Sequence, residues 1–120
     1  MAEPEVVDRA VLDSLLQMVN QDTAFLNEMI DEYFADTPKQ LAVMQQAAAS
    51  GNAAELRRAA HTMKSNSANF GATRLAQMCK ELEDLGKSGV LDGSVEKLAR
   101  IEAEYEQVRH ALQHARPAEA

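Results

Sequence analysis

The chain of 120 residues is 46% hydrophobic and 4% aromatic, and its 19 acidic and 12 basic residues give a net charge of −7. The length suits one domain with one core, and the acidic balance argues against a nucleic-acid partner, whose phosphates require a basic surface. No apolar stretch approaches the roughly 18 residues of a membrane-spanning helix, and the acidic start precedes no apolar run, so we expect neither membrane insertion nor a targeting segment.

The first two predicted helices are amphipathic. A short helix that ends near Asn20 and covers one end of the core is indicated by Val7, Val11, Leu12, Leu15, Met18 and Val19. Asp22 can cap a second helix, whose predicted buried side consists of Phe25, Leu26, Met29, Ile30, Tyr33 and Phe34. The run Thr37-Pro38-Lys39-Gln40 has the pattern of a capping box with proline at the first helical position. Either a new helix starts there, or one long helix is kinked at Pro38.

The next predicted helix carries a histidine on its polar face. Gly51 marks a stop, Asn52 and Glu55 form a capping-box pattern that starts the helix, and Gly71 ends it. At about 100° of rotation per residue, the apolar side lies opposite His61 and consists of Leu56, Ala59, Ala60, Met63, Ser67 and Phe70. We therefore expect His61 to face solvent.

The face around His61 is unusually clear of long side chains other than two cations. It carries Ala54, Arg57, Lys64, Ser65 and Ala68. Since helical side chains lean toward the N-terminus, those of Lys64 and Ser65 tilt back over the imidazole. Small residues on this face would let the surface of another protein approach.

Two more helices complete the chain. The fourth is predicted from Ala72 to Leu85 and ends in a Gly/Ser-rich turn from Gly86 to Gly89; its apolar side consists of Leu75, Met78, Cys79, Leu82 and Leu85. Cys79 is the only cysteine, so an internal disulfide is excluded, and a buried thiol in a reducing compartment is expected. The last helix buries Val95, Leu98, Ile101, Tyr105, Val108 and Leu112.

Short connections between long helices force antiparallel neighbours. We therefore predict an all-α fold, an up-down-up-down antiparallel four-helix bundle with an additional short N-terminal helix. A single domain should span residues 1–120, with frayed ends at about 1–6 and 116–120.

The chemistry that these residues favour is phosphoryl transfer. A neutral imidazole is a nucleophile toward phosphorus, Lys64 can neutralise part of the phosphoryl charge, and Ser65 can donate a hydrogen bond. A lone surface histidine is otherwise most often a spectator, and a surface lysine is often merely solvated. The sequence contains no Gly-rich phosphate loop or nucleotide motif, so we predict no autonomous ATP-dependent kinase activity.

The run from His61 to Ala72, followed by Leu75, Cys79 and Leu82-Glu83, resembles the signature of histidine phosphotransfer (HPt) domains of multistep two-component signalling. The stretch from Phe25-Leu26 through Thr37-Pro38 to Leu41 is similar to the helix that precedes the histidine in that family. The resemblance implies a helical bundle whose histidine accepts a phosphoryl group from one receiver-domain aspartate and returns it to another.

The resemblance also implies roles for individual residues. His61 takes the phosphoacceptor position, and Lys64 matches the phosphate-stabilising lysine. Ser65 stands where many members have a glycine that helps the partner approach. Glu83 falls where members often carry a glutamine or glutamate that orients the imidazole, and counting back from Gly71 puts it level with His61.

The implied partners are response-regulator receiver domains and an upstream sensor or hybrid histidine kinase. No cofactor is expected on the chain, because the receiver supplies Mg²⁺. An otherwise acidic protein carries a basic group that consists of Arg57, Arg58, Lys64, Arg74 and Lys80. Such a group could attract the acidic pocket of a receiver domain, and we predict this role for Arg57 and Lys64. We expect a cytoplasmic monomer, either a free protein or the cytosolic tail domain of a membrane-bound hybrid kinase.

Two other kinds of function compete with this prediction. A non-catalytic helical adaptor would dock a partner on the small-residue face, with His61 merely at the rim. A metal-holding bundle would use His110 and His114, one turn apart. We disfavour the metal because both histidines point away from the apolar stripe and only the mobile Glu106 could join them, so no metal site is predicted.

Overall fold

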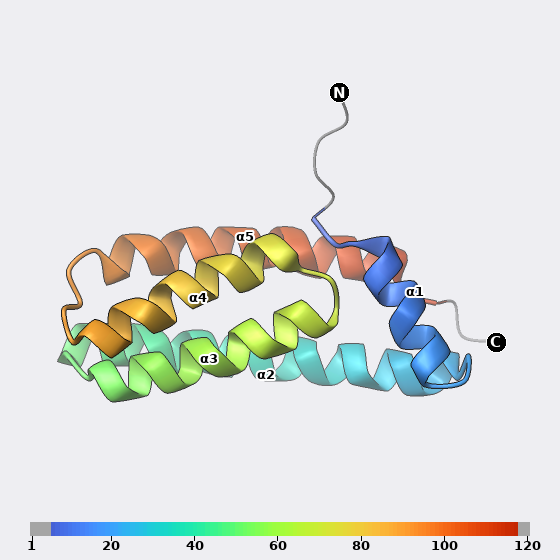
Figure 1. The fold of residues 1–120 in the computed structure, drawn as a ribbon, viewed down its shortest axis with the longest axis horizontal. Helices are drawn as coiled ribbons and strands as arrows, with labels where there is room; N and C mark the ends of the chain where they lie inside the picture. Colours follow the sequence, from blue (N-terminus) through green and yellow to red (C-terminus); the bar gives the residue numbers. More distant parts are fainter. Residues whose placement is uncertain (1–5, 118–120) are drawn as a thin grey trace, which may run out of the picture.

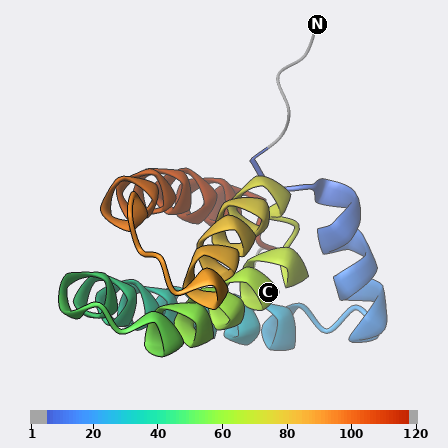
Figure 2. The same ribbon diagram turned by 60° about the vertical axis from the view of Figure 1, so that its left-hand side comes forward.

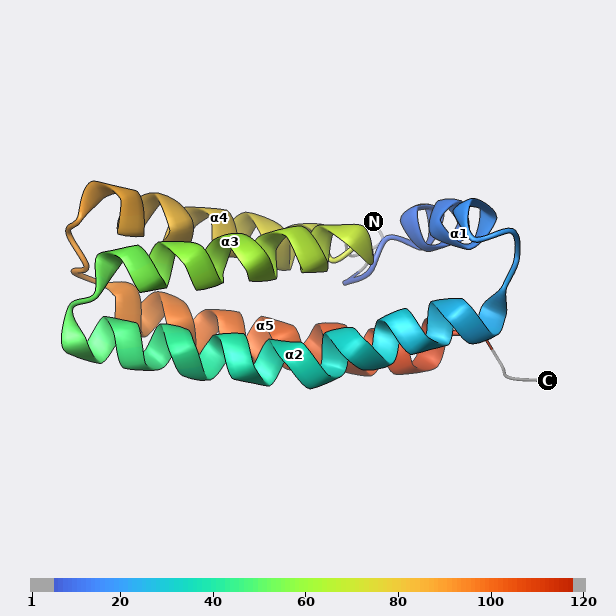
Figure 3. The ribbon, with the colours of Figure 1, turned by 90° about the horizontal axis from the view of Figure 1, so that it is seen from below.

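The computed structural model describes residues 6–117, and helices make up nearly all of this part of the chain. In chain order the helices are α1 (Arg9–Met18), α2 (Thr23–Ser50), α3 (Ala53–Asn69), α4 (Thr73–Ser88) and α5 (Ser94–Ala115). The four long helices run alternately up and down, with α3 and α4 in one layer and α2 and α5 in the other (Figures 1 and 3). No strand occurs within residues 6–117. The predicted all-α bundle with a short extra helix is confirmed.

The position of α1 follows from the unequal lengths of the two layers. The helices α2 and α5 have 28 and 22 residues, whereas α3 and α4 have 17 and 16. The helix α1 lies across the end of the bundle where the shorter layer stops (Figures 2 and 3). The backbone N–H of Asp8 donates to the Gly71 carbonyl at 2.8 Å and fixes α1 to the α3–α4 turn. The expectation that this helix covers one end of the core is confirmed.

The N-terminal caps of α2 and α3 agree closely with the sequence. Asp22 and Asn52 accept hydrogen bonds from the backbone N–H groups three residues ahead, at 3.0 and 3.1 Å. Only this half of the predicted box at Asn52 forms, because the Glu55 carboxylate pairs with Arg58 instead. Gly51 adopts φ 73°, the left-handed conformation that ends a helix.

The predicted capping box at Thr37 is wrong, since α2 passes through Pro38 without a break. The Thr37 hydroxyl donates to the Tyr33 carbonyl one turn back, at 2.7 Å, instead of capping a new helix. Proline removes one intrahelical hydrogen bond, and burial of Tyr33 and Met44 on either side of it holds the helix together. The alternative of one long helix is correct.

The interior consists mainly of aliphatic residues, with 0% exposure at Ile30, Leu56, Leu75 and Val108, which were all predicted on buried sides. Three residues expected on buried sides are exposed instead: Met18, Phe25 and Val95. Each lies in the first or last turn of its helix. Periodicity identifies the apolar side of a helix but not the point where the neighbouring helix stops covering it.

The predicted turn at Gly86 is also wrong, because α4 continues to Ser88 and ends at Gly89, which has φ 77°. Gly86 is buried inside the helix. A Cβ atom built on it would lie 2.9 Å from the Arg57 Cβ and 3.0 Å from the Ala53 carbonyl oxygen. Gly86 therefore marks a point where α4 approaches the backbone of α3, and these two helices share the most extensive contact in the bundle.

The chain is ordered further toward its C-terminus than predicted. Arg116 was expected to fray, but its Nε donates to Asn27 Oδ1 at 2.6 Å, and its guanidinium pairs with Asp31 at 2.8 Å. Asn27 in turn donates to the Pro117 carbonyl at 2.9 Å. Val6, also expected to fray, packs against the core. The remaining predicted frayed positions, 1–5 and 118–120, lie outside the described residues.

Candidate functional site

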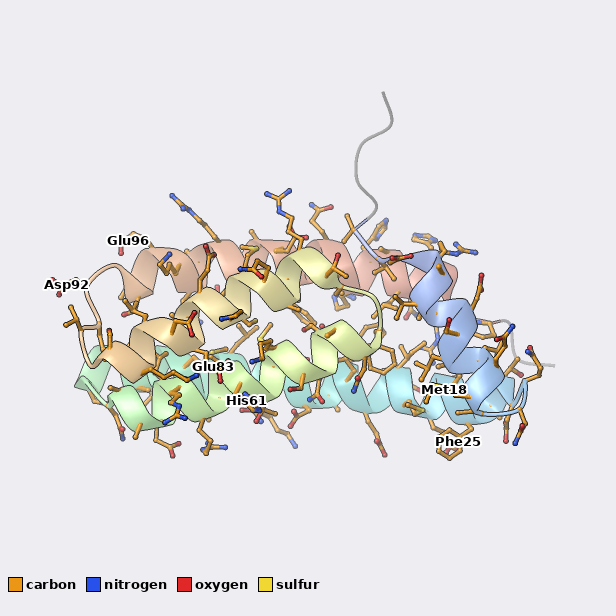
Figure 4. The ribbon with its side chains drawn as sticks, in the orientation of Figure 1. Met18, Phe25, His61, Glu83, Asp92 and Glu96 are labelled. Carbon is orange, nitrogen blue, oxygen red and sulfur yellow. The ribbon has the colours of Figure 1, made fainter. Side chains whose placement is uncertain are left out.

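His61 lies on the outer face of α3, near the middle of the helix, and its side chain is 59% exposed (Figure 4). On the opposite side of α3, Leu56, Ala60 and Met63 are buried in the core. The prediction that His61 faces solvent is therefore confirmed. A surface imidazole at this position can be reached by a group on another protein.

Glu83 of α4 joins the imidazole to a cation. Its side chain is only 6% exposed, and its Oε2 lies 2.8 Å from His61 Nδ1. Its other oxygen, Oε1, accepts a hydrogen bond from Lys64 Nζ at 2.6 Å. Figure 4 shows Glu83 and His61 close together on neighbouring helices. The predicted contact between Glu83 and His61 is present, but the bridge to Lys64 was not predicted.

Lys64 is less exposed than the sequence suggested, with a side chain that is 27% exposed. Its ammonium turns toward α4 and not outward into solvent. The prediction placed Lys64 over the His61 ring; the structure instead shows that Glu83 is the group that holds its end in place.

The electrostatics of this cluster fix the tautomer of the imidazole. The Lys64 hydrogen bond is the largest cause that lowers the pKa of Glu83, from 4.5 to about 2; burial opposes it, and the His61 hydrogen bond adds to it. Glu83 is thus a carboxylate at neutral pH, and a carboxylate can only accept hydrogen bonds. In neutral His61 the hydrogen must therefore be on Nδ1. The lone pair is left on Nε2, at the opposite edge of the ring.

An open hollow of about 480 Å³ lies beside His61, between α3 and α4. Its walls include the predicted partner-binding residues Ala54 and Arg57 together with Arg58, Thr62 and Lys87. Lys87 is not among the residues predicted for this site, because the sequence indicates a turn at Gly86. With α4 extended, Lys87 comes four residues after Glu83 and lies on the same face. Its spacing of four residues from Glu83 is the sequence signal that would have identified Lys87 as a residue of this site.

Other predicted residues lie farther from this hollow. Ser65 and Ala68 are exposed on α3, but neither lines it. Two members of the predicted basic group form ion pairs with nearby acids, Arg74 with Glu104 at 3.8 Å and Lys80 with Asp84 at 3.1 Å. Arg58 lines the hollow and pairs with Glu55. The basic group is therefore divided, with Arg57, Arg58 and Lys64 near His61.

The remaining polar candidates do not form a second site. His110 and His114 stack edge to face, with ring centroids 4.4 Å apart. Within residues 6–117 no group of three or more His, Cys, Asp or Glu side chains is placed to hold a metal ion. Cys79 is buried as predicted, and burial raises the pKa of its thiol to about 12.

No helix in the described part of the chain has the length and apolar character needed to cross a bilayer.

Comparison with known proteins identifies the family. The family model of the Hpt domain matches residues 28–111. The chain belongs to the Hpt domain family. The match includes His61, Lys64 and Glu83, and it confirms the resemblance seen in the sequence.

Two known proteins are similar to this HPt domain. The crystal structure of histidine-containing phosphotransfer protein B from Pseudomonas aeruginosa PAO1 superposes with a TM-score of 0.85 and 30% identity, covering 95% of this chain and 96% of that one. Multistep phosphorelay regulator 1 of Schizosaccharomyces pombe is 26% identical over 92 residues, which is 76% of this chain. The matched region is 31% of the length of that regulator.

Proposed function

We propose that this HPt domain accepts a phosphoryl group on His61 from the aspartyl phosphate of a receiver domain and passes it reversibly to another receiver aspartate. The observation that carries the proposal is the exposed His61 whose Nδ1 is held by the buried Glu83 carboxylate. Membership of the Hpt domain family supports it, as does the similarity to a multistep phosphorelay regulator.

In the proposed step, the lone pair of His61 Nε2 forms a bond to phosphorus while the bond between phosphorus and the aspartyl oxygen breaks. The aspartate leaves as a carboxylate, and the hydrogen on Nδ1 stays in place. The ring therefore gains positive charge as the N–P bond forms, and the adjacent Glu83 carboxylate stabilises it. The reverse step uses the same groups, because both phosphorylated species are high-energy compounds.

Lys64 and Ser65 would act on the transferring oxygens. An ammonium has three hydrogens to donate, and the bond to Glu83 uses one of them. The others remain for phosphoryl oxygens near Nε2, where added positive charge favours a dianionic group. Ser65, one turn from His61, can contribute a hydroxyl donor.

The hollow beside His61 would receive the receiver domain. In the family, receivers present an acidic pocket that supplies Mg²⁺, and Arg57 and Lys87 would attract it through charge complementarity. The small residues Ala54 and Ala68 would let its surface approach α3. We further propose a cytoplasmic monomer that relies on a sensor or hybrid kinase upstream for its phosphoryl groups.

The test is transfer of labelled phosphate from a phosphorylated receiver domain. The expected result is an acid-labile phosphate on the wild-type protein and none on His61→Gln. An adaptor would bind the receiver equally well with either protein and carry no such phosphate. Label on His61→Gln at the wild-type rate would contradict the proposal. Repeating the assay over a set of receivers identifies the partner as the one that exchanges phosphate fastest.

A further inference from the structure

We propose that Gly86 is a positioning residue for His61: its missing side chain lets α4 approach α3 closely enough for Glu83 to hold the imidazole. The effect on the tautomer of His61 depends on the contact with the Glu83 carboxylate and not on the proposed function. The effect on transfer rate rests on the function proposed above.

The register of the two antiparallel helices places Gly86 close to the contact between Glu83 and His61. Gly86 follows Glu83 by three residues on α4, so both lie on the same side of that helix. Arg57 precedes His61 by four residues on α3, and α3 and α4 are antiparallel. The contact between Gly86 and Arg57 is therefore one helical turn from the contact between Glu83 and His61. The distance between α3 and α4 at Gly86 thus sets their distance at Glu83 and His61.

The space at Gly86 is too small for any side chain. A Cβ atom there would lie 2.9 Å from the Arg57 Cβ, 3.0 Å from the Arg57 Cα and 3.0 Å from the Ala53 carbonyl oxygen. The last two are backbone atoms that cannot rotate away, so the helices would have to separate. Glycine is also less favourable than alanine inside a helix. Close packing against α3 explains its presence in α4.

The hydrogen bonds of Glu83 leave little room for such a shift. Its two oxygens are already engaged, at 2.8 Å with His61 and 2.6 Å with Lys64. Its side chain is buried, so new rotamers would meet the surrounding packing. A separation of a few tenths of an ångström at Gly86 would lengthen one or both bonds. The imidazole would then lose the carboxylate that keeps the hydrogen on Nδ1.

The experiment compares Gly86→Ala with the wild-type protein by ¹⁵N NMR of the His61 ring, recorded on the neutral imidazole. We expect the wild type to hold the hydrogen on Nδ1, and Gly86→Ala to show a mixture of both tautomers. Transfer from a phosphorylated receiver should slow on the order of tenfold, by analogy with the loss of a hydrogen bond that orients a metal-ligating histidine.

Two control variants separate positioning from general effects. Gln77→Ala introduces alanine at an exposed position of α4 and should leave both readouts unchanged. Val108→Ala removes buried volume from α5, so it should lower stability without moving the tautomer. A tautomer change in Val108→Ala as large as that in Gly86→Ala would overturn the proposal, because loss of stability would then be the cause.

Two double variants test the route of the effect. If Gly86 acts through Glu83, Gly86→Ala should add almost nothing to the slowing caused by Glu83→Ala. An equal slowing in both backgrounds would overturn the proposal. Arg57→Gly removes the nearest atom to the added Cβ but leaves the two backbone contacts, so it should shift the tautomer of Gly86→Ala only part of the way back toward the wild type. This partial relief gives a second measurement if the single variant folds poorly.

The outcomes for the two proposals differ. An unchanged tautomer and rate in Gly86→Ala would remove the positioning role while phosphotransfer through His61 stands. Label on His61→Gln would remove the phosphotransfer proposal, whereas the NMR result would still report on the contact between Glu83 and His61.

Discussion

Two polar clusters join helices of this bundle, and they differ in how far their polar side chains are exposed to solvent. Between α3 and α4, the buried Glu83 binds His61 and Lys64. Between α2 and the end of α5, Asn27 binds Arg116 and the Pro117 carbonyl, and Asp31 completes the cluster. Asn27 is 1% exposed and the Arg116 side chain 17%. The His61 side chain, by contrast, is 59% exposed.

The comparison separates a structural use of polar groups from a reactive one. At Asn27, side-chain donor and acceptor both have partners within the protein, so the cluster holds two chain segments together. At His61, Glu83 satisfies one ring nitrogen, and the other carries a lone pair on the solvent side. The same chemistry of buried polar groups with fixed partners thus holds one end of the bundle together and, in the proposed transfer, orients the nucleophile in its middle.

The largest expected effect is the loss of phosphoryl acceptance in His61→Gln, in the cluster around Glu83. We expect complete loss of phosphoryl acceptance, with a change in unfolding free energy below about 1 kcal/mol because the side chain is mostly exposed. Labelled transfer and chemical denaturation measure the two quantities. A large loss of stability would mean that His61 also has a structural role.

The converse variant is Asn27→Ala, in the closed cluster. It removes the side-chain acceptor of Arg116 Nε and the donor to the Pro117 carbonyl, whereas the backbone carbonyl of residue 27 keeps its bond from the guanidinium. We expect a loss of about 1–3 kcal/mol in unfolding free energy. Phosphotransfer should keep its wild-type rate. The matched control is Gln113→Ala, which removes a weaker, exposed hydrogen bond of Arg116 at 3.3 Å. Equal losses in the two variants would contradict the importance of the buried contact.

Acid should act on the open cluster through Glu83. The folded-state pKa of about 2 lies below the usual 4.5, so the ionised group stabilises the folded protein above about pH 4.5, and this contribution is lost as pH falls toward 2. Glu83→Gln cannot titrate. The difference in unfolding free energy between wild type and Glu83→Gln should therefore shrink as the pH falls from about 5 to about 2. Chemical denaturation at a series of pH values checks this. A constant difference would show that the charge of Glu83 is not involved.

A modest effect on stability is expected from Lys64→Met, which keeps most of the apolar stem and removes the ammonium. Glu83 retains His61 as a partner, so we expect a loss of about 1 kcal/mol at neutral pH. The pKa of Glu83 should rise, because the Lys64 hydrogen bond is the largest cause of its depression. Titration of the Glu83 carboxyl by NMR checks this, and an unmoved pKa would contradict the assigned cause.

The sequence by itself determined the helices and the face on which His61 lies. Apolar periodicity and the caps at Asp22 and Asn52 are local properties of the chain, and one helix carries both His61 and the buried residues opposite it. The solvent-facing imidazole could therefore be predicted without knowledge of any neighbour. Glu83 was placed level with His61 only by counting from the turn at Gly71, with the family resemblance to suggest its role.

Only the tertiary structure decided which groups meet. The bridge from Glu83 to Lys64 spans 19 positions, and the bond from Arg116 to Asn27 spans 89. Gly86 and Arg116 were predicted wrongly because composition near them is typical of a turn and a frayed end. Their actual roles depend on the backbone of α3 and the buried amide on α2. Periodicity shows which side of one helix is apolar, whereas the distance between two helices depends on how their surfaces pack.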